Sequence, residues 1–313
     1  MKISLLAFLR YGYVDGKYRC HGTKSSFKTM LHESNQVSYL TGINCNKKLA
    51  FRRDEPGADD SYSVGRSNTT VMFVNGLLSS MNGTKCSALQ RYCKKNNLSF
   101  LCFDYRGHGQ SSGQFIDCTM HDWIADASDM LDYIVSLGKE QNQDSNVILI
   151  GSSLGAWISL LLAMQKPDAI TAVIGIGSAI DYTSDTYDKL SVEQRTSMET
   201  SSSSNPLRIS SPYLDDAFPF TRDLYLSGND YLICEDNHLS KGIVYRELRC
   251  PVRFLHGDED DVVPYTKIYD AASALRSKYS GKDITIKLLK AGDHRLSTAD
   301  DVTAILDTLD EFL

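Results

Sequence analysis

A serine between two glycines is the clearest chemical signal in this sequence of 313 residues. Ser153 lies between Gly151 and Gly155, after the apolar run 146–150 and before the apolar run 156–164. A G-x-S-x-G motif that joins a buried strand to a helix forms a nucleophile elbow, because the glycines leave room for a tight turn. The first amides of the helix then face whatever the hydroxyl attacks. The motif predicts a serine nucleophile; the alternative is that Ser153 only caps the helix.

The base that such a serine requires is expected at His294. A serine hydroxyl is a poor nucleophile unless a base accepts its proton and an acid orients that base. The expected chain order is serine, acid, histidine, and His294 lies in the segment 291–295, between the last strand-like run and the last helical pattern. Other histidines are interpreted as surface or structural residues (His21, His32, His121 and His238) or as the organiser of a loop (His256).

The acid is predicted within the carboxylate-rich turn 258–261. We choose Asp260, because the middle of this turn should lie over the carboxyl edge of the sheet, between a strand and the next helix. Asp258 and Asp261 are expected to bind turn amides or to cap that helix. Asp181, which follows the preceding strand, is a rival for the same role.

Two backbone amides are needed to stabilise the oxyanion of an acyl-transfer reaction. One is expected from Leu154, directly after the nucleophile, and the other from Leu77 in the loop after the first parallel strand. Gly76 lets that loop approach the serine closely. Asn75 stands where a histidine often precedes the glycine, so no side-chain role is assigned to it.

The glycine-rich segment 103–113 invites a nucleotide-binding interpretation, but it contains neither G-x-G-x-x-G nor a P-loop lysine. We interpret it as a structural turn that borders the active site. No histidine or cysteine cluster has the spacing of metal ligands, so neither a metal nor an organic cofactor is predicted.

Apolar strand-like runs alternate with helical patterns from residue 69 onward. This alternation predicts an α/β fold with a mainly parallel sheet and helices on both faces. The predicted parallel strands are 70–74, 100–103, 147–150, 170–176, 252–255 and 284–289. Residues 37–40 and 48–52 are expected to add an antiparallel pair upstream.

Capping signals place two of the helices. Thr119 and Asp122 form a predicted capping box at the start of a helix that Gly138 is expected to end. Ser297 and Asp300 form a second predicted box ahead of the last helix.

The predicted hydrolase domain spans residues 37–313 and carries an insertion at about 181–249, where the alternation of strands and helices breaks. Its position after the fourth parallel strand predicts a lid. The apolar side chains of the insertion are expected either to cover an acyl-chain pocket or to anchor the insertion to the core, with at least half doing only the latter. These residues are Tyr213, Leu214, Phe218, Phe220, Leu224, Tyr225 and Leu232.

Residues 1–36 carry six basic residues before residue 29, several serines and few acids, the balance of a mitochondrial targeting segment. A weak secretory signal and a disordered terminus are the alternatives, and a cytoplasmic location follows from the last.

The composition excludes several classes of function. The net charge of −6 provides no basic surface for nucleic acid. No apolar run approaches the roughly 18 residues of a membrane span. The eight cysteines form no C-x-x-C pair, which favours free thiols in a reducing compartment.

Taken together, the motifs resemble the α/β-hydrolase superfamily over residues from about 37 to 313. Within it, the chain is similar to the family of abhydrolase domain-containing protein 10 in segments 75–85, 103–105, 109–113, 151–157 and 293–295, of which the run 81–85 is the most specific. That resemblance implies a mitochondrial serine hydrolase that removes S-palmitoyl groups from protein cysteines and hydrolyses acyl glucuronides. It also implies Ser153, Asp260 and His294 as the triad.

Three hypotheses follow for the function. The first is hydrolysis of acyl thioesters and esters by the triad, with an S-acylated protein or a small acyl ester as the partner. The second keeps this chemistry but changes the substrate to a monoacylglycerol or another small lipid ester. The third is a non-catalytic interaction protein with the same fold.

Overall fold

A mainly parallel sheet forms the centre of the molecule. The computed structural model describes residues 29–30, 37–41, 47–56, 68–140, 145–213, 216–234 and 247–313. Within these ranges the main sheet has nine strands in the order β1-β2-β3-β5-β4-β6-β7-β10-β11. Their bounds are β1 (Thr29–Met30), β2 (Ser38–Thr41), β3 (Lys48–Asp54), β4 (Thr69–Val74), β5 (Ser99–Phe103), β6 (Asn146–Ser152), β7 (Ile170–Ile176), β10 (Val252–Gly257) and β11 (Ile284–Leu289).

The six strands from β5 to β11 in the sheet order pair in parallel, as the sequence predicts. The predicted antiparallel pair is also confirmed, because β2 pairs with β3 and β3 continues antiparallel to β5. β1 pairs with β2 through Thr29 and Met30, so the sheet begins before residue 37, where the sequence analysis places its boundary. Residues 1–28 lie outside the described residues.

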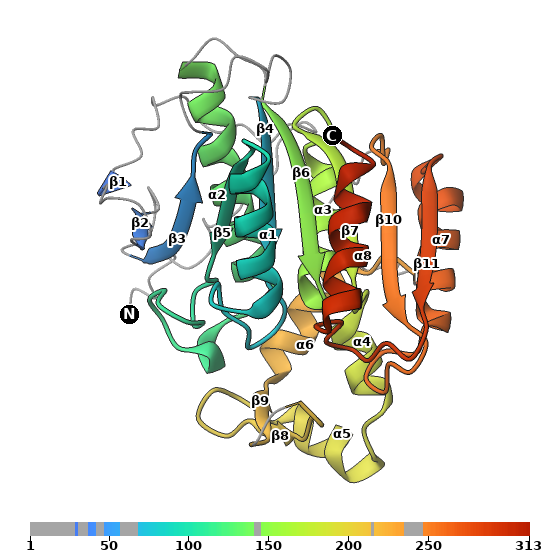
Figure 1. Ribbon diagram of the computed structural model, residues 1–313. Helices are drawn as coiled ribbons and strands as arrows, with labels where there is room; N and C mark the ends of the chain where they lie inside the picture. Colours follow the sequence, from blue (N-terminus) through green and yellow to red (C-terminus); the bar gives the residue numbers. More distant parts are fainter. Residues whose placement is uncertain are drawn as a thin grey trace.

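Helices cover both faces of the sheet (Figure 1). One face carries α1 (Thr84–Lys95) and α8 (Ala299–Asp310), and the other carries α2 (Met120–Glu140), α3 (Leu154–Gln165) and α7 (Thr266–Tyr279). Two separate apolar clusters fill these layers, one on each side of the sheet. Residues 154–164 of α3 are all buried, because the sheet and α2 both contact this helix. Such burial on both faces explains why the parallel strands are continuous apolar runs rather than alternating ones.

The insertion after β7 lies beyond the carboxyl ends of the parallel strands, at the bottom of Figure 1. It contains α4 (Tyr182–Asp188), α5 (Val192–Glu199), β8 (Leu207–Ile209), β9 (Phe218–Phe220), α6 (Arg222–Gly228) and η2 (Asn229–Tyr231). β8 and β9 pair with each other as a separate antiparallel sheet. Phe218, Phe220, Leu224 and Leu232 belong to the buried core, so these four anchor the insertion. Leu214 lies outside the described residues.

Two predicted helix boundaries are wrong. α2 continues through Gly138 to Glu140. The capping box of α8 uses Thr298 and Asp301, whose side chains each accept the other's backbone N–H, rather than Ser297 and Asp300. The sequence satisfies the capping pattern in both registers, one residue apart, so the pattern cannot choose between them.

The predicted box at the start of α2 is half present. The Asp122 carboxylate accepts the Thr119 N–H at 3.0 Å, and the Thr119 hydroxyl donates to the same carboxylate at 2.9 Å instead of accepting the Asp122 N–H. A short helix, η1 (Phe115–Asp117), precedes this point.

The cysteines of the described residues are free thiols, namely Cys86, Cys93, Cys102, Cys118, Cys234 and Cys250. Burial raises the pKa of Cys93, Cys118 and Cys250 to about 12, so these thiols stay protonated and inert. Cys20 and Cys45 lie outside the described residues. No helix in the described part of the chain is long and apolar enough to span a bilayer.

The contact between α4 and α6 gives a stability prediction. A Cβ added at Gly228 would lie 1.9 Å from Thr183 Oγ1, and Thr183 is fully buried. Gly228→Ala is therefore expected to lower the free energy of unfolding by about 1–3 kcal/mol through overpacking, measured by urea denaturation. Thr183→Ala in the same chain should restore part of this loss.

Gly83→Ala is the matched control, because its added methyl group would lie 3.5 Å from the nearest atom, Ser80 O. Gly83 is the N-cap of α1, where alanine is less favourable than glycine, so the effect of Gly83→Ala should be at most about 1 kcal/mol and smaller than that of Gly228→Ala. Equal effects of the two glycine substitutions would contradict the steric explanation.

Candidate active site

The G-x-S-x-G motif forms the predicted sharp turn between β6 and α3. Ser153 has φ 53° and ψ −119°, a conformation that few residues with a side chain adopt. A Cβ at Gly151 would lie 2.4 Å from Gly155 O, and one at Gly155 would lie 2.1 Å from Val74 O. Only glycine fits at either position. The Ser153 N–H donates to Ile176 O at 2.8 Å, which holds the turn against the neighbouring strand.

Ser153, His294 and Asp260 meet at the carboxyl edge of the sheet. His294 Nε2 lies 3.0 Å from Ser153 Oγ, and His294 Nδ1 lies 2.8 Å from Asp260 Oδ2. An ionised carboxylate can only accept, so Nδ1 carries the proton and Nε2 is free to accept the serine hydroxyl proton. The Asp260 side chain is fully buried and that of His294 nearly so, with 13% exposed. The structure thus brings the three predicted residues into one continuous hydrogen-bonded relay.

The Asp260 carboxylate is held by four donors. Oδ1 accepts the Val262 and Val263 N–H groups at 2.9 and 2.8 Å, and Oδ2 faces His294 and also His256 Nε2 at 3.1 Å. Burial alone would raise the pKa of Asp260, but the hydrogen bonds from His256 and His294 lower it well below its ordinary value. Asp260 therefore stays ionised.

His256 has the loop-organising position that the sequence predicts. It is fully buried, and its Nε2 contacts Val263 O at 2.8 Å as well as Asp260. This ring thus joins the end of β10 to the turn that carries the acid.

The competing carboxylates have other partners. Asp181 accepts the Ile233 and Cys234 N–H groups at 2.8 and 2.7 Å, which ties the residues after η2 to the start of the insertion. Asp258 accepts the Ala291 N–H at 2.6 Å, in the amide-binding role predicted for it. Asp261 differs from the prediction, because it accepts the Tyr213 hydroxyl at 2.8 Å instead of a backbone amide.

The loop after β4 lies against Ser153, as expected. A Cβ at Gly76 would lie 3.2 Å from Ser153 Cβ, so glycine permits this approach. Within the described residues, the backbone N–H groups of Leu77 and Leu154 donate to no other protein group. Both amides are thus available to a substrate oxygen. The buried Asn75 amide donates to Phe103 O at 2.7 Å, which explains its role as a support for this loop.

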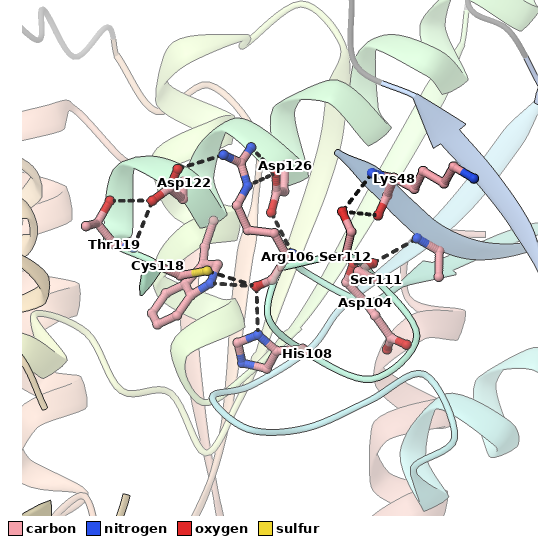
Figure 2. A network of polar contacts seen from close by, with 12 residues as sticks. Lys48, Asp104, Arg106, His108, Ser111, Ser112, Cys118, Thr119, Asp122 and Asp126 are labelled. Carbon is pink, nitrogen blue, oxygen red and sulfur yellow. Dashed lines mark hydrogen bonds and ion pairs between the residues drawn. The ribbon is translucent and has the colours of Figure 1, made fainter. Parts of the chain in front are cut away.

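His108 supports the same loop and was not predicted to do so. The Leu78 N–H donates to His108 Nε2 at 3.0 Å, and His108 Nδ1 lies 3.2 Å from Arg106 O. Figure 2 shows the Arg106 guanidinium between Asp122 and Asp126. The backbone carbonyl oxygen of Arg106 faces His108. Burial lowers the pKa of His108, so the ring is neutral and its Nε2 can accept. The only sequence signal for this role is a histidine between two glycines.

Tyr213 connects the insertion to the loop that carries His294, residues 291–297, which we name the base loop. The Tyr213 hydroxyl accepts the His294 N–H at 3.4 Å, and the two rings lie 5.8 Å apart. The Arg295 guanidinium lies over the Tyr213 ring and donates to Tyr213 O at 3.0 Å. Tyr213, which was expected only to line the pocket or to anchor the insertion, thus also contacts the backbone of His294.

Among the described residues, no group of three His, Cys, Asp or Glu side chains could hold a metal ion. The groups that meet at the site are the Ser153 hydroxyl, the His294 imidazole and the Asp260 carboxylate.

The fold and the site define an α/β hydrolase. A family described as "Serine aminopeptidase, S33" matches residues 65–210. The mouse palmitoyl-protein thioesterase ABHD10, mitochondrial, is 31% identical over 244 residues, which cover 78% of this chain and 74% of the mouse protein. The rat protein of the same name is 31% identical over 247 residues, covering 79% and 75%. The chain therefore belongs to the α/β-hydrolase family that includes ABHD10, and it is a hydrolase.

Solved structures support the same family. The chain matches alpha/beta hydrolase domain-containing protein 10 from mouse with a TM-score of 0.67 and 27% identity, over 92% of this chain and 98% of that one. A putative hydrolase from Agrobacterium vitis matches with a TM-score of 0.69 and 25% identity, over 92% and 97%.

The two best candidate acids can be separated by matched substitutions. Asp260→Asn should lower kcat on a p-nitrophenyl ester by about 10⁴-fold, because the imidazole would lose its orienting carboxylate. Asp181→Asn should act chiefly on stability, by about 1–3 kcal/mol, since it weakens the acceptor of two buried amides. The reverse result, an active Asp260→Asn variant and an inactive but folded Asp181→Asn variant, would overturn the assignment.

Proposed function

We propose that this protein hydrolyses acyl thioesters and esters, with Ser153 as nucleophile, His294 as base and Asp260 as the orienting acid. The proposal rests on two consecutive hydrogen bonds, of 3.0 Å between His294 Nε2 and Ser153 Oγ and of 2.8 Å between His294 Nδ1 and Asp260 Oδ2. They end on a serine with a strained backbone conformation. A protein that only binds partners has no use for an ionised buried carboxylate, an oriented imidazole and a serine in this conformation.

In the proposed reaction, Ser153 Oγ forms a bond to the carbonyl carbon of the substrate while its proton passes to His294 Nε2. The imidazolium is stabilised by Asp260, which remains ionised. The tetrahedral intermediate collapses as the thiol or alcohol leaves with the proton from His294. Water then attacks the acyl-enzyme by the same route, which releases the carboxylic acid and restores the serine.

The Leu77 and Leu154 amides are proposed to bind the oxyanion. Each such donor is worth about 10²–10³-fold in rate when it is fixed in advance. The support for this role is their position, on either side of the nucleophile and without a protein acceptor in the described part of the chain. The hydrogen bond from Leu78 to His108 keeps the first of these segments in place.

We propose S-palmitoylated protein cysteines as the principal substrate and acyl glucuronides as a second class. The names of the mouse and rat relatives support the first, and the family resemblance of the motifs supports the second. The insertion 181–249 is proposed to act as a lid, because it lies over the carboxyl edge of the sheet and contacts the base loop through Tyr213. A mitochondrial location is proposed on the same relatives and on the basic segment 1–36.

Substitution of the nucleophile tests the reaction. Ser153→Ala should lower kcat on a p-nitrophenyl acyl ester by at least about 10³-fold and abolish covalent labelling by a fluorophosphonate probe. Ser152→Ala is the matched control, because this neighbour has no part in the relay and should retain labelling. A folded Ser153→Ala variant with most of the original turnover would end the proposal.

A substrate comparison tests the specificity. Rates measured on an S-palmitoyl peptide, an acyl glucuronide and a monoacylglycerol under the same conditions should rank the monoacylglycerol last in kcat/KM. We expect the thioester to react fastest, because a thiol of pKa about 8.5 leaves more readily than an alcohol. A monoacylglycerol that reacts fastest would instead make the protein a lipid esterase.

A further inference from the structure

Lys85 joins helix α1 to the base loop. Its Nζ donates a hydrogen bond to the carbonyl oxygen of Arg295, the residue directly after His294. α1 and α8 lie side by side on one face of the sheet (Figure 1), and the Tyr92 hydroxyl donates to Asp310 further along the same pair of helices. Lys85 belongs to the run 81–85, which the proposed chemistry does not use.

Other elements hold the base loop on the other side of His294. The Ala291 N–H donates to the Asp258 carboxylate at 2.6 Å, and the Glu259 N–H donates to Gly292 O at 3.1 Å. These bonds fix the loop where it enters from β11 and faces the acid turn.

Beyond His294 the backbone bonds are mostly local. The Leu296 N–H donates to Asp293 Oδ1 at 2.9 Å, and the Ser297 hydroxyl donates to Arg295 O at 3.0 Å, both within the loop. The bond from Lys85 ties this part of the loop backbone to a separate helix.

The carboxylates that stabilise the Lys85 charge come from outside its own helix. A cation in the first turn of a helix opposes the helix dipole, and the first turn of α1 contains no acidic residue to offset it. The compensating carboxylates come from Asp293 in the base loop and Asp301 in α8, while Arg295 repels the ammonium. Burial, the largest influence, lowers the pKa of Lys85 from its ordinary value of 10.5 to about 8.

We propose that the Lys85 ammonium is a positioning group for the base: it holds the base loop so that His294 Nε2 stays within reach of Ser153 Oγ. This inference rests on the proposed function. A charged donor binds a carbonyl oxygen more strongly than a neutral amine does and is also attracted by Asp293 and Asp301. Deprotonation of Lys85 therefore loosens the loop and lowers the rate of acyl transfer.

The first test removes the donor. Lys85→Met should lower kcat on a p-nitrophenyl ester by about 10–100-fold at neutral pH, with little change in KM, because small displacements of a base act on the chemical step. Lys94→Met, at the exposed end of the same helix, is the matched control and should stay within about twofold of the original kcat.

The second test uses the pH dependence. The original protein should lose kcat above a pH of about 8, whereas Lys85→Arg, which remains charged, should keep its kcat to a pH of about 10. The loss of kcat above pH 8 cannot come from a loss of folding stability caused by the titration of Lys85. The unfolded chain binds that proton more tightly, so between pH 8 and 10.5 this group adds stability as pH rises.

The outcomes separate the two proposals. If Lys85→Met retains the original kcat, or if Lys85→Arg shows the same alkaline loss as the original protein, the positioning role is wrong. Ser153→Ala is assayed beside them. If it is inactive, the proposed function stands, whatever the result for the Lys85 variants. If it is active, the proposed reaction is wrong. Thermal unfolding of each variant at neutral pH confirms that a fall in kcat occurs in folded protein.

Discussion

A buried carboxylate that stays ionised is the constraint on which the site depends. Burial penalises the charge of Asp260, and the charge persists because two backbone amides and two imidazole rings surround it. Two of these donors come from the turn that contains the residue, and the rings come from β10 and from the base loop. The turn follows β10 directly, so the charge is stabilised where this strand-and-turn segment meets the base loop.

The elbow imposes a second constraint of opposite character. Ser153 is held in a strained backbone conformation by close approaches that tolerate no side chain at Gly151 or Gly155. The strain is local, and the fully buried α3 behind it provides the packing that sustains it. The site thus combines an electrostatic arrangement set by loops with a steric arrangement set by the sheet and its central helix.

The sequence predicts the parts of this site that are encoded locally. Ser153 and His294 can be found because each follows an apolar strand and precedes a helix, and glycine marks the first of them. Asp260 could be chosen among four acids only from the geometry expected of a strand end. His108, Tyr213 and Lys85 were not assigned their contacts, since their partners lie 30, 81 and 210 residues away in the chain. Such pairings depend on how the layers pack, and no short pattern records them.

The Asp181 carboxylate accepts two hydrogen bonds, from the backbone amides of Ile233 and Cys234, and this pair of bonds affects how such proteins can diversify. Residues 182–232 thus begin and end beside one carboxylate, and between these points they also pack on the core and contact the base loop. This stretch contributes no strand to the main sheet, and β7 before it pairs directly with β10 after it. Changes of length or sequence between residues 182 and 232 can therefore accumulate without a shift in the register of the parallel strands that precede Ser153 and Asp260.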